Sequence, residues 1–258
     1  MIRLGICGAG GRMGSAILSL AVKDKDIQVT GLVEAPGYPL VGKDVQGVAL
    51  RGGLREVVDK CDVIIDFTSP ASTLENAQVL ARSGKALVVG TTGLQGKDRE
   101  LFIQTVKAIP VVFSPNMSLG ANLLFEYVEA MARLLPGYDA EIVEIHHNLK
   151  KDAPSGTAHR LAESVQRGKQ GGDFVYGRQG LVGERKPSEI GVHALRGGDV
   201  VGDHTVFFMG NGERVELIHR VTSREAFANG ALTAAKWLGG KPAGLYDMRD
   251  VLGFARPE

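Results

Sequence analysis

The chain has 258 residues, of which 44% are hydrophobic and 23% charged, a balance typical of a globular protein that buries a substantial core. Its formal net charge of +1 gives no electrostatic reason to expect nucleic acid or a membrane surface as a partner. The two cysteines, Cys7 and Cys61, stand beside apolar strands without metal-ligand spacing, which predicts buried thiols in a reducing compartment. Because the chain opens on a strand without a leader pattern, and no apolar run approaches membrane-spanning length, we expect a cytoplasmic protein.

The first predicted strand, Ile2–Cys7, runs into a glycine-rich turn and then into a helix over residues 15–22. A strand, a glycine turn and a helix form the first half of a dinucleotide-binding unit, where glycines let the backbone approach a pyrophosphate. The match to G-x-G-x-x-G is imperfect, because Met13 occupies the third glycine position and Gly14 follows it. Tight strand-to-helix turns also use glycine for steric reasons, so the turn alone is weak evidence.

A carboxylate further along the chain strengthens this interpretation. The second apolar run, Ile27–Val33, ends at Glu34, which lies 20 residues beyond Gly14. An acidic residue at this distance accepts hydrogen bonds from the adenosine ribose hydroxyls in dinucleotide-binding domains. The alternative is a surface glutamate after an ordinary turn. The combination predicts a nicotinamide-dinucleotide site.

Strands and helices continue to alternate as far as residue 117. This alternation predicts an α/β fold with a parallel, doubly wound sheet, whose ligand lies at the C-terminal ends of the strands. The glycine-rich turn at 90–93 is by itself more typical of a plain turn. The predicted strands cover 62–67, 85–89 and 110–113, and the predicted helices cover 54–60, 70–83 and 96–107.

From Ser118 the pattern changes, with several extended segments in succession. Such a run predicts a separate, smaller α+β domain with an open, mixed sheet. Residues 168–186 are glycine-rich and charged, and we expect a mobile loop there. The tail at 248–252 is expected to pack back on the first domain. The predicted helices cover 119–135, 158–167 and 224–238, and the predicted strands cover 138–145, 189–196, 199–209 and 213–221.

Residues 146–157 hold the densest set of reactive groups. His146 and Lys150 stand four residues apart on a loop or distorted turn, and both exchange protons near neutral pH. Ser155, Gly156 and Thr157 open a helix, so their amides can bind a carboxylate. Together these groups predict a pocket for a small carboxylated substrate that faces a hydride donor.

The same segment allows other interpretations. A histidine pair can form half of a metal site, but no third ligand stands at metal-site spacing, so we predict no metal. Lys150 and Lys151 can be a solvated charge pair, and Ser155 a simple helix cap. The remaining histidines are expected to be structural or exposed: His159, His193, His204 and His219.

The pattern Glu-x-His-His-x-x-Lys-x-Asp-x-Pro-Ser-Gly-Thr at 144–157 is distinctive. On this pattern the chain resembles the 4-hydroxy-tetrahydrodipicolinate (dihydrodipicolinate) reductase family over its whole length. The resemblance implies a Rossmann domain, 1–117 completed by about 228–258, and a domain for substrate binding and tetramerisation, 118–227. It also implies hinges between them and a homotetramer built through the sheets of the second domain. Further matching motifs are Gly-Ala-Gly-Gly-Arg-Met-Gly at 8–14, Asp-Phe-Thr at 66–68, Gly-Thr-Thr-Gly at 90–93, Ala-Asn-Gly at 228–230, and 244–252.

The resemblance also implies an activity: reduction of an unsaturated cyclic dicarboxylate to tetrahydrodipicolinate by NADH or NADPH, in diaminopimelate and lysine biosynthesis. His146 would be the proton donor or acceptor, and Lys150 the proton donor that completes saturation. His147, Gly156 and Thr157 would hold the substrate. The residues implied to line the cofactor are Gly8, Ala9, Gly10, Gly11, Arg12, Met13, Glu34, Gly90, Thr91, Thr92, Ser114, Pro115, Asn116 and Met117.

One departure from the family pattern bears on the cofactor. Family members often carry arginine after the ribose-binding carboxylate, where it can meet a 2′-phosphate, and here that position is Ala35. We therefore expect NADH to serve at least as well as NADPH. Two other functions stay open: a two-domain dehydrogenase acting on homoserine or aspartate, and a non-catalytic protein that senses dinucleotides.

Overall fold

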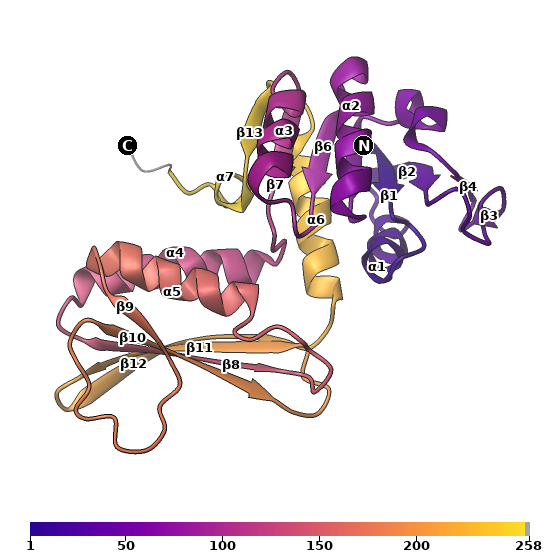
Figure 1. Ribbon diagram of the computed structural model, residues 1–258. Helices are drawn as coiled ribbons and strands as arrows, with labels where there is room; N and C mark the ends of the chain where they lie inside the picture. The colour runs from indigo at the N-terminus through magenta and orange to yellow at the C-terminus, as the bar shows by residue number, and fades with distance from the viewer. Residues whose placement is uncertain (256–258) are drawn as a thin grey trace. The chain divides into compact units, whose positions relative to one another are not determined.

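The computed structural model describes residues 1–255 and divides into two compact units (Figure 1). The first unit contains Met1–Leu119 together with the chain from Arg224 onward, and the second contains Gly120–Ser223. The first unit is therefore assembled from two separate stretches of sequence, and the second from the stretch between them. Within the described residues, no helix has the length and apolar character needed to cross a membrane.

The first unit is built on an eight-stranded sheet in the order β13-β7-β6-β5-β1-β2-β4-β3. Neighbouring strands run parallel, except for the antiparallel pair β3 and β4. The doubly wound parallel sheet expected from the sequence is thus confirmed. The strands are β1 (Ile2–Cys7), β2 (Ile27–Val33), β3 (Asp44–Val45), β4 (Val48–Arg51), β5 (Val63–Asp66), β6 (Ala86–Val89), β7 (Pro110–Phe113) and β13 (Gly244–Tyr246).

Helices cover both faces of this sheet, which explains why its central strands are almost entirely apolar. Helices α1 (Arg12–Ala21) and α6 (Glu225–Leu238) share one hydrophobic core with the sheet, and α2 (Pro70–Ser83) and α3 (Gly96–Val106) share the other. The short helix α7 (Met248–Leu252) adds a buried methionine to the core of α1 and α6. The tail therefore packs on the first unit, as the sequence predicted.

The second unit has a five-stranded mixed sheet in the order β12-β11-β8-β10-β9. Its central strand runs parallel to β10 and antiparallel to β11. Helices α4 (Leu119–Leu134) and α5 (Gly156–Lys169) pack side by side on one face and share a core with the strands beneath them (Figure 1). The open, mixed sheet is as predicted. The strands are β8 (Asp139–His146), β9 (Asp173–Tyr176), β10 (Glu189–Arg196), β11 (Gly202–Gly210) and β12 (Glu213–Val221).

The opposite face of this sheet carries an ionic cluster. Glu141 of β8 accepts hydrogen bonds from Arg178 and Arg185, which belong to the loop between β9 and β10. His193 of β10 approaches the same carboxylate at 2.7 Å. Burial alone would raise the pKa of Glu141, but these donors hold it at about 2. The loop is therefore tied over the sheet by charge-assisted hydrogen bonds.

Several local predictions are corrected. Residues 168–186 are not one loop, because Asp173–Tyr176 pairs with β10 and forms a strand. The helix predicted over 54–60 consists of two 3₁₀ turns, Leu54–Glu56 and Val58–Lys60. Helix α1 begins at Arg12 rather than at residue 15. The short strands β3, β4 and β13 were not predicted, because two to four residues are too few to show a periodic pattern.

Candidate functional site

The glycine-rich turn after β1 shows why two of its glycines are needed. Gly8 has φ of +80°, and a Cβ on it would lie 2.6 Å from the Phe67 carbonyl oxygen. A Cβ on Gly14 would lie 2.0 Å from the Gly8 carbonyl oxygen. Gly14 thus allows the close packing of helix on strand that the third glycine provides in this motif. The imperfect match in the sequence reflects a shift of that glycine by one position.

Replacing Gly14 with alanine is expected to destabilise the protein. Alanine is favoured over glycine in a helix by about 1 kcal/mol, but the new methyl group would overlap backbone atoms that cannot rotate away. Overpacking of this kind costs about 1–3 kcal/mol, so we expect a net loss in the free energy of unfolding. Urea denaturation measures it, with Gly37→Ala as control, since a Cβ on Gly37 meets nothing within 4 Å. Equal stability of the two variants would contradict the packing argument.

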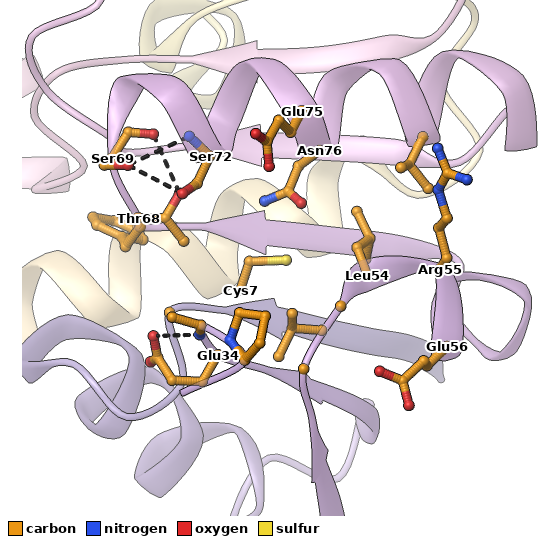
Figure 2. A pocket seen from close by; sticks show the side chains of 18 of the residues that line it. Cys7, Glu34, Leu54, Arg55, Glu56, Thr68, Ser69, Ser72, Glu75 and Asn76 are labelled. Carbon is orange, nitrogen blue, oxygen red and sulfur yellow. Dashed lines mark hydrogen bonds between the residues drawn. The ribbon is translucent and has the colours of Figure 1, made fainter. Parts of the chain in front are cut away.

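Glu34 lies at the end of β2, next to the same turn. Its Oε2 accepts a hydrogen bond from the Gly10 amide at 2.9 Å, and its Oε1 accepts one from the Ala35 amide at 3.0 Å. The carboxylate is therefore fixed beside the turn (Figure 2). It retains lone pairs for further donors, because a carboxylate has about four acceptor sites.

A cavity of about 940 Å³ opens at the C-terminal ends of β1, β2 and β5. Three of the predicted cofactor residues line it: Gly8, Gly11 and Glu34. Figure 2 shows the opposite wall, formed by Ser69 at the N-terminus of α2 and by Asn76 further along this helix. Four more of the predicted cofactor residues belong to the same turn or to the first turn of α1: Ala9, Gly10, Arg12 and Met13. The others follow β6 and β7 and do not line this cavity: Gly90, Thr91, Thr92, Ser114, Pro115, Asn116 and Met117.

The N-terminus of α1, like those of α3 and α6, lacks a side-chain cap, and it directly follows the glycine-rich turn after β1. Its cap residue is Gly11, which has no side chain to accept hydrogen bonds from the first amides of the helix. Helices α2, α5 and α7 begin instead with Ser69, Ser155 and Asp247, whose side chains accept from the first amides. The first amides of α1 receive no such cap and can donate to a pyrophosphate. Together with Glu34 and the cavity, this helix end fits a dinucleotide.

A buried carboxylate organises the neighbouring strand ends. Asp66 is fully buried at the end of β5 and accepts hydrogen bonds from the Thr68 hydroxyl at 2.6 Å and the Asn76 amide group at 2.9 Å. The hydroxyls of Thr73 and Thr91 also donate to it. Burial raises the pKa of Asp66 despite these donors. The carboxylate thereby ties the turn after β5 to the turn after β6, a role that the sequence did not reveal.

In the second unit, strand alternation places Glu144 and His146 on the face covered by α5. Glu144 is fully buried, and one of its oxygens lies 2.5 Å from His146 Nδ1. Arg196 of β10 donates two hydrogen bonds to the same carboxylate, at 2.8 and 2.9 Å, and the Ser155 amide donates another at 3.0 Å. Burial would raise the pKa of Glu144, but the hydrogen bonds from His146 and Arg196 hold it at about 2.

His204 is a further member of this cluster. Its ring centroid lies 5.2 Å from that of His146, and its Nε2 lies 3.1 Å from the Ser155 hydroxyl. Burial lowers the pKa of His204 to about 3, so its imidazole is neutral at neutral pH. The register of β11 against β8, which pairs His204 with Glu144, brings it here. This pairing over a long sequence distance could not be inferred from the sequence.

The other predicted substrate residues lie on the segment that follows β8. The Lys150 amide donates to the His147 carbonyl in a turn, and the Lys150 Nζ lies 2.9 Å from the Asp152 carboxylate. Ser155 caps α5 by accepting from the Ala158 amide, so Gly156 and Thr157 form its first turn. The structure thus brings His146 and the start of α5 together at the buried Glu144, whereas Lys150 contacts Asp152 on the segment between them. Among the described residues, no group of three or more His, Cys, Asp or Glu side chains could hold a metal ion.

Comparison with known proteins gives one consistent result. Two family models match in chain order: "Dihydrodipicolinate reductase, N-terminus" over residues 2–117 and "Dihydrodipicolinate reductase, C-terminus" over residues 120–252. The 4-hydroxy-tetrahydrodipicolinate reductase of Geobacter metallireducens is 47% identical over 98% of this chain and 100% of its own length. The enzyme of the same name from Anaeromyxobacter sp. is 50% identical, over 98% of each chain.

Solved structures agree in fold. The dipicolinate-bound dihydrodipicolinate reductase from Paenisporosarcina sp. TG-14 has a TM-score of 0.79 and 22% identity, over 96% of this chain and 97% of that one. Aspartate dehydrogenase from Thermotoga maritima is more distant, with a TM-score of 0.53 and 13% identity, over 93% of this chain and 98% of that one. Both family models and the full-length relatives lead to the same conclusion: the chain belongs to the dihydrodipicolinate reductase family.

Proposed function

We propose that the protein is an NAD(P)H-dependent oxidoreductase that reduces 4-hydroxy-tetrahydrodipicolinate to tetrahydrodipicolinate, in diaminopimelate and lysine biosynthesis. The observation that carries this proposal is the cluster around His146, in which the buried Glu144, the Arg196 guanidinium and the capped end of α5 meet. Full-length relatives that bear this activity in their name support it. The first unit would bind the dinucleotide, and the second unit the substrate.

The cofactor would be held by the turn at 8–13 and the N-terminus of α1, which donate to the pyrophosphate, and by Glu34, which accepts from the ribose. The turns at 90–92 and 114–117, which follow β6 and β7, would line the rest of it. When bound, the reduced nicotinamide supplies a hydride. Asp66 keeps the turn after β5 in place through its bonds to Thr68 and Asn76.

The substrate would be held in the second unit by His147, Gly156 and Thr157. The N-terminus of α5 carries a partial positive charge and can receive a carboxylate. A related structure is described as binding dipicolinate, which is also a cyclic dicarboxylate. His146 would donate or accept the proton, and Lys150 would donate the proton that completes saturation. The ion pair of Lys150 with Asp152, at 2.9 Å, would hold its ammonium group on the segment between His146 and α5.

The direct test is oxidation of NADH by the purified protein in the presence of freshly generated cyclic substrate from a coupled enzyme. Rapid, substrate-dependent oxidation is the expected result. Turnover with homoserine or aspartate and none with the cyclic substrate would instead identify an amino-acid dehydrogenase. Binding of NADH without turnover of any of the three would identify a dinucleotide sensor.

The protein is expected to form an oligomer, and we propose a homotetramer built through the sheets of the second unit. The edge strand β12 pairs only with β11, and exposed apolar side chains such as Ile218 and Leu195 lie on this sheet. An open edge of this kind usually finds a partner or is protected. Light scattering at micromolar concentration measures the assembly, and a monomer would contradict the proposal.

A further inference from the structure

The carboxylate of Glu144 contacts both parts of the proposed substrate site, the proton-transfer residue and the N-terminus of α5. One side of its carboxylate contacts His146, the proposed proton donor, and the other accepts from the Ser155 amide at the start of α5. Arg196 spans both oxygens and also donates to the Asp152 carbonyl at 2.7 Å. These partners belong to β8, β10 and the segment before α5. A single buried group therefore joins three parts of the fold.

The ionisation of Glu144 decides which nitrogen of His146 carries hydrogen. An ionised carboxylate only accepts hydrogen bonds, so the 2.5 Å contact requires Nδ1 of His146 to be the donor. Nε2 is then the nitrogen that can exchange a proton. It faces Gly202 of β11, where a Cβ would approach it to 3.0 Å. The lack of a side chain at Gly202 leaves room around Nε2.

We propose that Glu144 is a positioning residue for the reaction: it directs proton exchange to Nε2 of His146 and, through the Ser155 amide, holds the helix end that receives the substrate carboxylate. This inference rests on the proposed function. It assigns to Glu144 an effect on proton transfer as well as on substrate binding. A group that only stabilised the fold would have neither effect.

The charges around His146 give the sign of the expected pH effect. Within residues 1–255, Glu144 on its own strand is the carboxylate that contacts His146 directly. Arg196 of β10 bonds the same carboxylate, Lys150 of the following turn pairs with Asp152, and His204 of β11 is neutral. His219 of β12 lies behind His204, with ring centroids 6.5 Å apart. Removing the negative charge of Glu144 would leave the Arg196 guanidinium without its carboxylate near His146, which disfavours a second positive charge on the ring. If protonated His146 is the acid in the reaction, the loss of activity with rising pH should occur at a lower pH in a variant without this charge than in the wild type.

The strand itself supplies a matched control. Glu141, on the opposite face of β8, is bonded to two arginines and a histidine, where Glu144 is bonded to one arginine, a histidine and a backbone amide. The pKa of Glu141 is likewise held at about 2. Glu144→Gln and Glu141→Gln each remove one buried charge from the same strand. Light scattering and circular dichroism check that both variants keep the assembly and fold of the wild type.

The experiment compares kcat, kcat/KM against pH, and NADH affinity for these variants. Glu144→Gln is expected to lower kcat by roughly 10- to 100-fold, the usual loss when an orienting partner of histidine is removed. The alkaline limb of kcat/KM should move to lower pH by about one unit or more. NADH affinity should stay the same, and Glu141→Gln should match the wild type within about twofold, well below the lower end of that range. An unshifted pH profile in Glu144→Gln, or an equal loss in Glu141→Gln, would overturn the proposal.

Two further measurements keep the result interpretable. The position of hydrogen on the His146 ring, followed by NMR of the ring nitrogens without substrate, should favour Nδ1 in the wild type and lose that preference in Glu144→Gln. This holds even if the wild type fails to reduce the proposed substrate, so failure of the function and failure of this inference are distinguishable. If Glu144→Gln does not fold, Gly202→Ala tests the same idea by crowding Nε2, and kcat should fall by roughly tenfold or more. Unchanged kcat in Gly202→Ala would overturn the assignment of Nε2.

Discussion

Replacing His146 with glutamine, or Lys150 with alanine, is expected to lower kcat by ~10²–10⁴-fold, the contribution typical of a positioned proton-transfer group. Glutamine keeps much of the size and polarity of histidine but cannot exchange a proton near neutral pH. Alanine at 150 removes the ammonium group and its ion pair with Asp152. Steady-state kinetics with the cyclic substrate measures kcat, and fluorescence titration measures NADH binding. NADH affinity should be nearly unchanged, because both residues belong to the second unit.

Two neighbouring residues provide controls for this result. His159 lies on the exposed side of α5 and pairs with Glu163, so His159→Gln removes a histidine without touching the cluster. Lys151 is an exposed neighbour of Lys150, so Lys151→Ala is the matched control for Lys150→Ala. Both control variants should keep kcat within about threefold of the wild type, a bound set well below the range for proton-transfer groups. Losses under about threefold in His146→Gln and Lys150→Ala as well would refute their assignment.

The cofactor preference is expected to depend on residue 35, with NADH used at least as well as NADPH. Glu34 is held beside the glycine turn by the Gly10 amide, in a position to accept from ribose hydroxyls, and its charge repels a 2′-phosphate. Ala35 lines the same cavity and offers neither charge nor side-chain donor. A charged hydrogen bond contributes ~1.5–3 kcal/mol, so its absence should weaken NADPH binding by roughly 10- to 100-fold.

The variant Ala35→Arg tests this argument, because a guanidinium at 35 could form a bidentate contact with the phosphate. The ratio of kcat/KM for the two cofactors should shift toward NADPH. Ala35→Met is the control, since it adds a side chain without charge and should leave the ratio unchanged. Arg55 lines the same cavity and Arg12 and Lys43 lie in nearby turns, so some NADPH activity is expected in the wild type. A tenfold preference of the wild type for NADPH, or no response to Ala35→Arg, would contradict the prediction.

Much of the fold was accessible from the sequence because its signals are local. Apolar runs such as Ile27–Val33 and caps such as Ser69 before Pro70 mark strands and helix starts within a few residues. The strand Asp173–Tyr176 was missed for the opposite reason. Phe174, Val175 and Tyr176 favour a strand, but the run is only 4 residues long and its surroundings are rich in glycine and charge, so the pairing with β10 is what establishes it.

Some residues of the candidate site could likewise be found from local sequence signals, and others could not. His146 and Lys150 could be found from their spacing, and Glu144 could have been assigned a place beside His146, because residues two apart on a strand share a face. Arg196 and His204 could not, since they reach the cluster through the registers of β10 and β11 against β8. The contacts of Asp66 likewise join turns that follow different strands.

The division of the first unit into two stretches has a consequence for synthesis on the ribosome. The second unit is continuous in sequence and precedes α6, β13 and α7, so it emerges from the ribosome before they do. The core beneath α1 lacks Ala231, Leu238 and Met248 until then, because these residues come from the last stretch. The nascent first unit must therefore expose apolar surface while the second unit folds, which is when chains are most prone to aggregate. A chain that ends before α6 would lack the last stretch of the first unit but would still contain all of the second unit.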